Sequence, residues 1–162
     1  MKKYDLVTHT FPPIFDKNSK ILILGSIPSI KSREANIYFG NPKNRFWKIL
    51  SIILDAPYPK SNQEKIDLVL KNNIALWDVL ESCEIYRSSD STIKNPKIND
   101  FNVIFNVADI KAVFTIGKTA YNLFNKYTKQ TAIYLPSTSP ANCAISEEYL
   151  IKEFSKILDY IK

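Results

Sequence analysis

The sequence predicts an α/β protein, specifically a three-layer α/β/α sandwich around a short, mostly parallel central sheet. Two observations support this prediction. Apolar runs of strand length, at residues 20–24 and 112–116, each end at a glycine, and segments with apolar residues at helical spacing lie between the runs. Strands that alternate with helices are typical of parallel sheets. The length of 162 residues suits one domain, so we expect a single domain over residues 1–162.

The elements follow from local patterns. The prolines of residues 8–13 indicate an extended entry segment. A helical turn is expected through Leu80, and the polar stretch 84–98 is expected to be a loop. Continuous apolar runs predict buried strands at 20–24, 112–116 and 132–135, and residues 74–77 form a further short apolar run. Apolar spacing and capping residues predict helices at 44–54, 62–71, 100–107 and 118–126, and a last helix that begins at Ser146.

Composition limits the partners. No apolar run approaches the roughly 18–20 residues of a membrane helix and no secretory signal is visible, so we expect a cytoplasmic protein without a membrane partner. Two cysteines and one histidine do not make a metal cluster, so we expect no metal and no cofactor. The net charge of +6 favours a polyanionic partner, although a lysine-rich composition explains it equally well. We expect a monomer.

Two loops of small polar residues are predicted at the same edge of the sheet. Residues 25–29 (Gly-Ser-Ile-Pro-Ser) follow the first strand, and residues 136–142 follow the last one. Ligands of parallel sheets bind beyond the carboxyl ends of the strands. Taken alone, residues 25–29 are typical of an ordinary turn, because they match no phosphate-binding motif.

A third segment, residues 38–47 (Tyr-Phe-Gly-Asn-Pro-Lys-Asn-Arg-Phe-Trp), carries asparagines and aromatic residues around a turn. Phe39 precedes a glycine, and its ring is a candidate wall for an extruded base. Phe46 and Trp47 are expected in the core. Asn44 has two interpretations at this stage, a polar group of the site or the cap of the following helix.

These three segments resemble the motif blocks of the deoxyinosine (hypoxanthine) glycosylases, a branch of the uracil-DNA glycosylase superfamily. Residues 75–84 and 89–94 also resemble that branch, so the resemblance runs from about Phe11 to Asn142. The Pro-x-Asn-Arg-Phe-Trp pattern at 42–47 is also similar to the mismatch-specific uracil glycosylases. The resemblance implies a monofunctional DNA glycosylase that flips out a deaminated base (hypoxanthine, with uracil and xanthine as further candidates) and hydrolyses its N-glycosidic bond in base excision repair.

The resemblance also implies roles for residues. Asn44 takes the place of the catalytic asparagine, Asn142 is a second candidate for contact with the base or its water, and Phe39 takes the place of the stacking aromatic residue. The other candidates for the base site are Gly25, Ser26, Ile27, Pro28 and Asn41. The candidates for contact with DNA are Ser29, Lys43, Arg45, Ser137, Thr138, Ser139 and Ile145, with Lys31, Arg33 and Lys118 as further phosphate contacts. Ile145 is equally well explained as a buried residue at the start of a helix.

Two departures from the superfamily's patterns bear on the mechanism. Ile27 stands where other branches carry an Asp or Asn that positions water. Catalysis is therefore expected to depend more on Asn44. Asn41 stands where the family usually has His, and an amide carries no titratable proton. For Asp78 and Asp90 the sequence favours solvated or capping roles over a place in the pocket, and for His9 a surface or packing role.

Other functions remain open at this stage. A mismatch-type uracil or thymine glycosylase is the alternative within the enzyme class. Outside it, the alternatives are a non-catalytic α/β module that binds a nucleotide and a protein that binds DNA lesions without cutting. Formation of abasic sites in DNA separates the enzymes from the binding modules.

Overall fold

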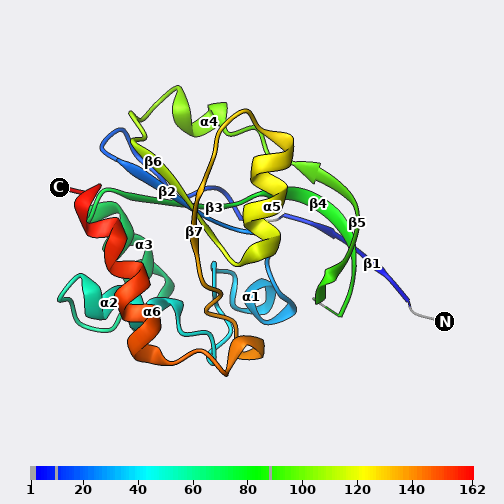
Figure 1. Cartoon of the computed structure of the whole chain (residues 1–162), viewed down its shortest axis with the longest axis horizontal. Helices are drawn as coiled ribbons and strands as arrows, with labels where there is room; N and C mark the ends of the chain where they lie inside the picture. The colour runs from blue at the N-terminus through cyan, green and yellow to red at the C-terminus, as the bar shows by residue number, and fades with distance from the viewer. Residues whose placement is uncertain (1–2, 10, 88) are drawn as a thin grey trace.

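The computed structural model describes residues 3–9, 11–87 and 89–162. Its centre is a four-stranded parallel sheet in the order β3-β2-β6-β7, with helices around it (Figure 1). This confirms the predicted fold class. The strands of the sheet are β2 (Ile21–Gly25), β3 (Ile74–Asp78), β6 (Ala112–Ile116) and β7 (Ile133–Leu135). Each strand lies within one residue of an apolar run, because strands covered on both faces need apolar side chains throughout.

The helices also follow the sequence pattern, with differences at their ends. Ser61 and Glu64 form the predicted capping box of α3, and Ser146 accepts a hydrogen bond from Tyr149 N as the cap of α6. The last predicted helix is divided between α6 and a 3-10 turn at 155–159, and α1 was not predicted. The helices are α1 (Ile30–Ala35), α2 (Phe46–Ile53), α3 (Asn62–Lys71), α4 (Asn102–Phe105), α5 (Lys118–Tyr127) and α6 (Glu147–Phe154).

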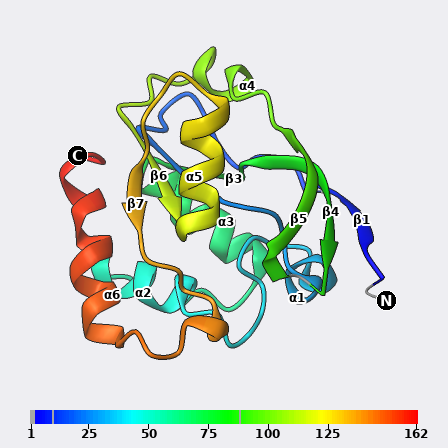
Figure 2. The same cartoon turned by 45° about the vertical axis from the view of Figure 1, so that its right-hand side comes forward.

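The prediction for residues 78–98 is wrong. The described residues form no helical turn through Leu80, and most of the stretch 84–98 is strand instead of loop. Instead an antiparallel sheet in the order β1-β4-β5 is present, and Figure 2 shows it beside the parallel sheet. Its strands are β1 (Asp5–Thr8), β4 (Leu80–Tyr86) and β5 (Ser89–Ile98). The sequence hides these strands because register shifts interrupt the pairing of β4 with β5 and most of β5 is exposed or half-buried, which removes the regular apolar alternation.

Residue 79 alone separates the two sheets along the chain, since β3 ends at Asp78 and β4 begins at Leu80. Val79 N donates to Gly25 O and Leu80 N donates to Ser26 O, so the chain is held as it leaves the parallel sheet. This connection brings the antiparallel sheet to the edge where β2 and β3 end.

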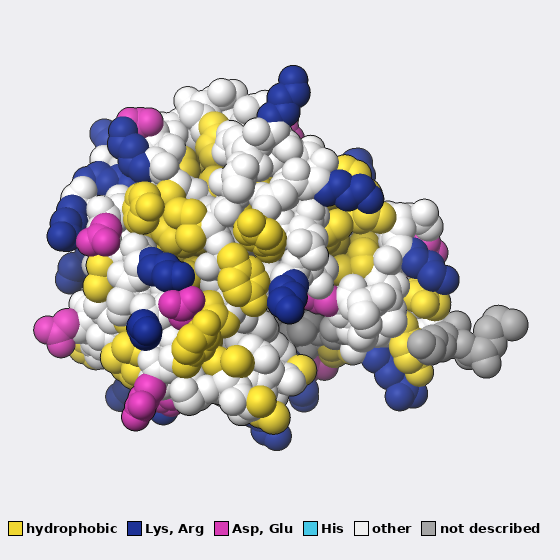
Figure 3. Space-filling model, viewed as in Figure 1, with side chains coloured by type: hydrophobic (Ala, Val, Ile, Leu, Met, Phe, Trp, Pro, Cys, Tyr) yellow, Lys and Arg dark blue, Asp and Glu magenta, His cyan; other side chains and the backbone are white. Residues whose placement is uncertain are grey.

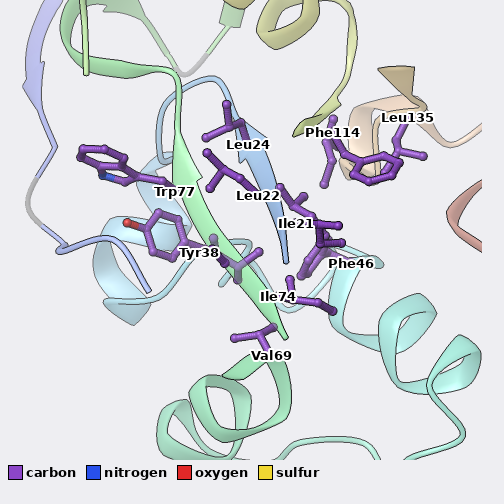
Figure 4. Packing of buried hydrophobic residues seen from close by; sticks show 14 of the residues in the cluster. Ile21, Leu22, Leu24, Tyr38, Phe46, Val69, Ile74, Trp77, Phe114 and Leu135 are labelled. Atoms are coloured by element: carbon purple, nitrogen blue, oxygen red, sulfur yellow. The ribbon is translucent and has the colours of Figure 1, made fainter. Parts of the chain in front are cut away.

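The main core joins the parallel strands to the helices. Phe46 and Trp47, at the start of α2, are fully buried as predicted, and α2 packs on α6. Figure 4 shows side chains that meet from the four parallel strands, from α2 and α3, and from Tyr38. Within the described residues, no helix is both long and apolar enough to cross a lipid bilayer.

Candidate base-binding cleft

One cleft of about 580 Å³ lies at the carboxyl ends of the parallel strands. Residues 25–29, after β2, and residues 137–142, after β7, both line it. Phe39 and Asn44 line it as well. The volume falls within the range of about 300–1,000 Å³ usual for small-molecule pockets. The three segments that the sequence analysis singled out therefore meet at one place.

Most of the predicted site residues lie on this cleft. Lys43, Arg45 and Ile145 do not line it, whereas Lys118, a candidate phosphate contact at the first residue of α5, does. The predicted residues that line the cleft are Gly25, Ser26, Ile27, Pro28, Ser29, Phe39, Asn41, Asn44, Ser137, Thr138, Ser139 and Asn142.

The N-cap of α2 is Arg45 and not Asn44, but the Asn44 amide bonds the backbone just after that position. Its Oδ1 accepts a hydrogen bond from Phe46 N at 2.9 Å, which satisfies a backbone donor at the start of α2. Because the backbone N–H occupies the oxygen, the orientation of the amide is fixed. Nδ2, a two-proton donor, has no hydrogen-bond partner among the described residues. Asn44 therefore lines the cleft with a donor group free to meet a ligand.

The Phe39 ring stacks on the buried Phe46 ring, with centroids 4.1 Å apart and an interplanar angle of 22°. The backbone of Phe39 has φ of +54°, a conformation that L residues rarely adopt and that often marks functional sites. Gly25 explains part of this packing, because a Cβ at Gly25 would lie 3.5 Å from the Phe39 ring and 2.6 Å from Asp78 Oδ1. A side chain at position 25 would thus clash with the Asp78 carboxylate, while its Cβ would only touch the Phe39 ring.

The loop after β7 is held by its own side chains. Ser137 Oγ accepts from Ser139 N at 3.2 Å, Ser139 Oγ accepts from Ala141 N at 3.2 Å, and Asn142 Nδ2 donates to Ser137 O at 2.9 Å. These bonds give the loop a defined shape. They also fix the orientation of the Asn142 amide, because one of its two N–H donors is committed to the loop, and its Oδ1 is left for a ligand.

Arg45 connects the segment of residues 38–47, to which it belongs, with the loop after β7. Its Nη1 donates to Ile145 O at 2.6 Å, its Nη2 donates to Asn142 O at 3.1 Å, and its backbone N–H donates to Thr138 O at 3.1 Å. The guanidinium therefore holds backbone carbonyls in place at the position where a phosphate contact was predicted. Ile145 is half-buried and packs against the main core.

Two carboxylates line the cleft, those of Asp78 and Asp90, although the sequence favoured solvated or capping roles for both. Ser26 Oγ lies 3.1 and 3.0 Å from the carboxylate oxygens of Asp90 and donates to them. Although Asp90 as a residue is exposed, its carboxylate lies inward: desolvation raises its pKa, the Ser26 hydrogen bond lowers it, and the charge of Asp78 raises it further. Asp90 was missed because its strand was not predicted.

Asp78 is buried and lines the cleft. Its Oδ2 accepts from His9 Nε2 at 2.8 Å, and the side chains of His9 and Asp78 are only 3% and 5% exposed. A signal for Asp78 was available in the sequence, because it directly follows a buried strand at the edge where Gly25 lies. His9 has the packing role that the sequence favoured, and its hydrogen bond to Asp78 is an addition.

Charge is distributed rather than concentrated around the site. Figure 3 shows lysine and arginine side chains spread over one face among apolar and uncharged groups. Among the described residues, no group of three or more His, Cys, Asp or Glu side chains is arranged to hold a metal ion. Amide, hydroxyl, carboxylate and aromatic side chains line the cleft.

Comparison with known proteins places the chain in a family. A model of the "Uracil DNA glycosylase superfamily" matches residues 12–162. A hypoxanthine DNA glycosylase of Methanosarcina acetivorans is 34% identical over 146 residues, which cover 88% of this chain and 92% of that protein. One of Methanosarcina barkeri is 36% identical over 110 residues, covering 67% and 70%.

A solved structure agrees with these relatives. The solution NMR structure of a proposed uracil DNA glycosylase from Methanosarcina acetivorans superposes with a TM-score of 0.77 at 29% identity, covering 95% of this chain and 99% of that one. The family match includes all four strands of the parallel sheet and, in the antiparallel sheet, β4 and β5. The chain belongs to the uracil DNA glycosylase superfamily.

Proposed function

We propose that the protein is a monofunctional DNA glycosylase that extrudes a deaminated base, hypoxanthine above all, and hydrolyses its N-glycosidic bond. The observation that supports this most is the pairing of the Phe39 ring and the Asn44 amide in one cleft, in a chain similar to two hypoxanthine DNA glycosylases. An aromatic face receives an extruded base, and a fixed donor beside it meets the charge that the base acquires on leaving.

The proposed reaction needs no covalent intermediate with the protein. The N-glycosidic bond breaks with both electrons going to the base, the sugar gains oxocarbenium character, and a water oxygen then bonds to C1′ and loses a proton. Asn44 Nδ2 donates to the departing base, because Oδ1 is already occupied by Phe46 N. Residues 25–28 and Asn41 complete the base pocket, and Asn142 offers its Oδ1 to the base or to the attacking water.

The DNA backbone is proposed to cross the rim of the cleft. Ser137, Thr138 and Ser139 present a shaped loop to a phosphate, and Lys118 and Lys43 add positive charge nearby. Ser29 caps α1 through its Oγ, which accepts from Ser32 N at 3.1 Å, so it reaches phosphate only as a secondary contact. Since all of these residues come from one chain, we propose that a monomer acts, in the cytoplasm where genomic DNA is accessible.

The substrate is tested with oligonucleotides. Duplex and single-stranded DNA containing inosine, uracil, xanthine or a G·T pair is incubated with the protein and then treated with alkali, which cleaves at abasic sites. We expect abasic sites from inosine at the highest rate. A preference for uracil or G·T would support the mismatch-type alternative, and no abasic sites from any substrate would overturn the proposal in favour of a binding module.

Two variants of Asn44 test its role. Asn44→Ala removes both the acceptor for Phe46 N and the free donor, and loss of one hydrogen bond costs about 0.5–1.5 kcal/mol of stability. Asn44→Asp keeps the acceptor but has no donor, so we expect both variants to lose about 10²–10³ in rate while only the alanine variant melts earlier. DNA affinity should stay within a few-fold of the wild type.

Asn102→Asp is the matched control, because Asn102 is exposed in the first turn of α4 and does not line the cleft. Activity of Asn44→Ala near that of the wild type would refute the assignment. Full activity of Asn44→Asp with loss in Asn44→Ala would move the role from the donor to the oxygen.

A further inference from the structure

A row of three tyrosines borders the cleft at the edge of the parallel sheet. Tyr121 lies on α5, Tyr134 on β7 and Tyr149 on α6. Tyr134 also lines the cleft, so the row, called the tyrosine surface below, is continuous with the site. Figure 3, which draws tyrosine with the apolar side chains, shows apolar groups that follow one another over α5, β7 and α6. The fold thus brings together aromatic residues from three separate elements.

Contacts between the tyrosines hold them side by side. The rings of Tyr121 and Tyr134 meet edge to face, with centroids 5.7 Å apart and an interplanar angle of 86°. Desolvation raises the pKa of Tyr134, and the nearby Tyr149 raises it further, so these two phenol groups lie close to each other. Tyr149 is 45% exposed, and the other two are half-buried. All three side chains therefore reach the surface together.

Positive charge lies beside the tyrosine surface. Lys118 precedes Tyr121 by three residues on α5. Lys152 follows Tyr149 by the same interval on α6, so each lysine shares a helix face with a tyrosine. Both lysines are exposed, and no salt bridge within the described residues includes either of them. Glu148, one turn before Lys152, offsets part of its charge, so Lys118, on the cleft, is the main cation.

The chemistry of this surface fits unpaired DNA better than a duplex. In a duplex each base is covered by its neighbours, and the outside offers mainly sugar and phosphate. In a single strand the base faces are free, and they stack on aromatic side chains whatever their sequence, while lysines beside the rings neutralise the phosphates. Exposed rings next to a lysine are thus suited to a strand whose bases have left the helix.

We propose that Tyr134 and Tyr149 stack with unpaired bases that flank the extruded nucleotide on the same DNA strand. Tyr121 is a positioning residue, because its ring packs against Tyr134. Lys118 neutralises a phosphate where the strand passes from the tyrosine surface into the cleft. The inference rests on the proposed function, since the extruded nucleotide in the cleft brings the strand to this surface.

The test measures binding separately from catalysis. The probe is a short, fluorescein-labelled oligothymidine, which contains no deaminated base, and its affinity is measured by fluorescence anisotropy. We expect Tyr149→Ala to bind about 5- to 100-fold more weakly than the wild type, as for the loss of one stacked base. Tyr149→Phe keeps the ring and should bind like the wild type. Tyr127→Ala is the matched control, because Tyr127 is 48% exposed and ends α5, whereas Lys118 begins it.

Three results would overturn the inference. The first is a wild type that does not bind oligothymidine. The second is an affinity of Tyr149→Ala that equals that of the wild type or of Tyr127→Ala. The third is an equal loss in Tyr149→Phe and Tyr149→Ala, because it would assign the contact to the hydroxyl group instead of the ring.

A second measurement uses the wild type alone and does not depend on whether a variant folds. Oligonucleotides that contain 5-iododeoxycytidine, whose base crosslinks to a stacked aromatic side chain on irradiation, are bound to the protein and the attached peptide is identified. We expect crosslinks at Tyr134 or Tyr149, and crosslinks only elsewhere would overturn the inference. Excision of hypoxanthine without binding to oligothymidine would overturn the inference alone, whereas binding without excision of any base would overturn the proposed function alone.

Discussion

The Asp90 carboxylate lies in surroundings that disfavour its charged form. Desolvation in the cleft and the nearby charge of Asp78 both raise its pKa, and the Ser26 hydroxyl offsets only part of this effect. A carboxyl group whose pKa is higher in the folded state than in the unfolded state stabilises the fold only while it is protonated. As the pH rises through its folded pKa, that stabilisation is lost. The cleft keeps Asp90 at the expense of stability, a common feature of functional sites.

Replacing Asp90 by Asn should therefore stabilise the protein near neutral pH. The amide keeps the shape and can bond Ser26, but it carries no charge. We expect a higher melting temperature than the wild type at about pH 7, and a smaller difference near the ordinary carboxyl pKa of about 4, where both side chains are mostly neutral. Thermal melting at the two pH values, with Asp109→Asn as the control, checks this. A lower melting temperature of Asp90→Asn at neutral pH would contradict it.

Single residues differ in how much of their role the sequence could reveal. The position of Asn44 between a turn and a helix predicted either a cap or a site residue. The N-cap is Arg45, whereas Asn44 bonds Phe46 N through its oxygen and lines the cleft. The link between His9 and Asp78 could not be predicted, because it joins residues 69 positions apart and the antiparallel sheet beside it was not predicted. Long-range pairs of this kind depend on tertiary packing and leave no local pattern.

Arg45 and Lys118 show how two cationic side chains near one cleft differ. The Arg45 guanidinium is bound to the carbonyls of Asn142 and Ile145, and it holds the start of α2 against the loop after β7. Lys118 is exposed on the cleft, and none of the salt bridges among the described residues includes it. Of the two, only the Lys118 side chain is free to neutralise a phosphate.

This difference predicts separate effects on DNA binding. Loss of one phosphate contact lowers the slope of log affinity against log salt concentration by about 1, so Lys118→Met should show this change. Arg45→Met should leave the slope unchanged and should lower the melting temperature, because hydrogen bonds from a charged group contribute about 1.5–3 kcal/mol. Binding titrations at several salt concentrations, together with thermal melts, measure both effects. A lower slope for Arg45→Met would assign a phosphate contact to it after all.

At the scale of elements, burial decided what could be predicted. The four parallel strands are apolar throughout, and their ends identified the edge that carries the site. β5 is mostly exposed. Its sequence is therefore polar and could not be distinguished from that of a loop. Residues 25–29, 38–47 and 136–142 were predicted to form the site, and they do line the cleft. The residues that β4 and β5 contribute to the cleft could not be predicted, because the sequence did not indicate these strands.

The whole molecule places the cleft between two sheets. The parallel sheet supplies Gly25 and Asp78, and the antiparallel sheet supplies Ile85, Ser89 and Asp90. The direct passage from β3 to β4 through residue 79 keeps the two sheets together. The cleft is thus formed by the same connection that joins the two halves of the fold, and Phe39, from residues 38–47, lines it as well.

A structure of the wild-type protein bound to a duplex with 2′-fluoro-deoxyinosine tests this arrangement most directly. The electron-withdrawing fluorine disfavours the oxocarbenium-like state, so the N-glycosidic bond survives. We predict hypoxanthine in the cleft, stacked on Phe39, with Asn44 Nδ2 within hydrogen-bonding distance of its edge. A hypoxanthine that stays stacked in the DNA, or that binds at another surface, would contradict the account.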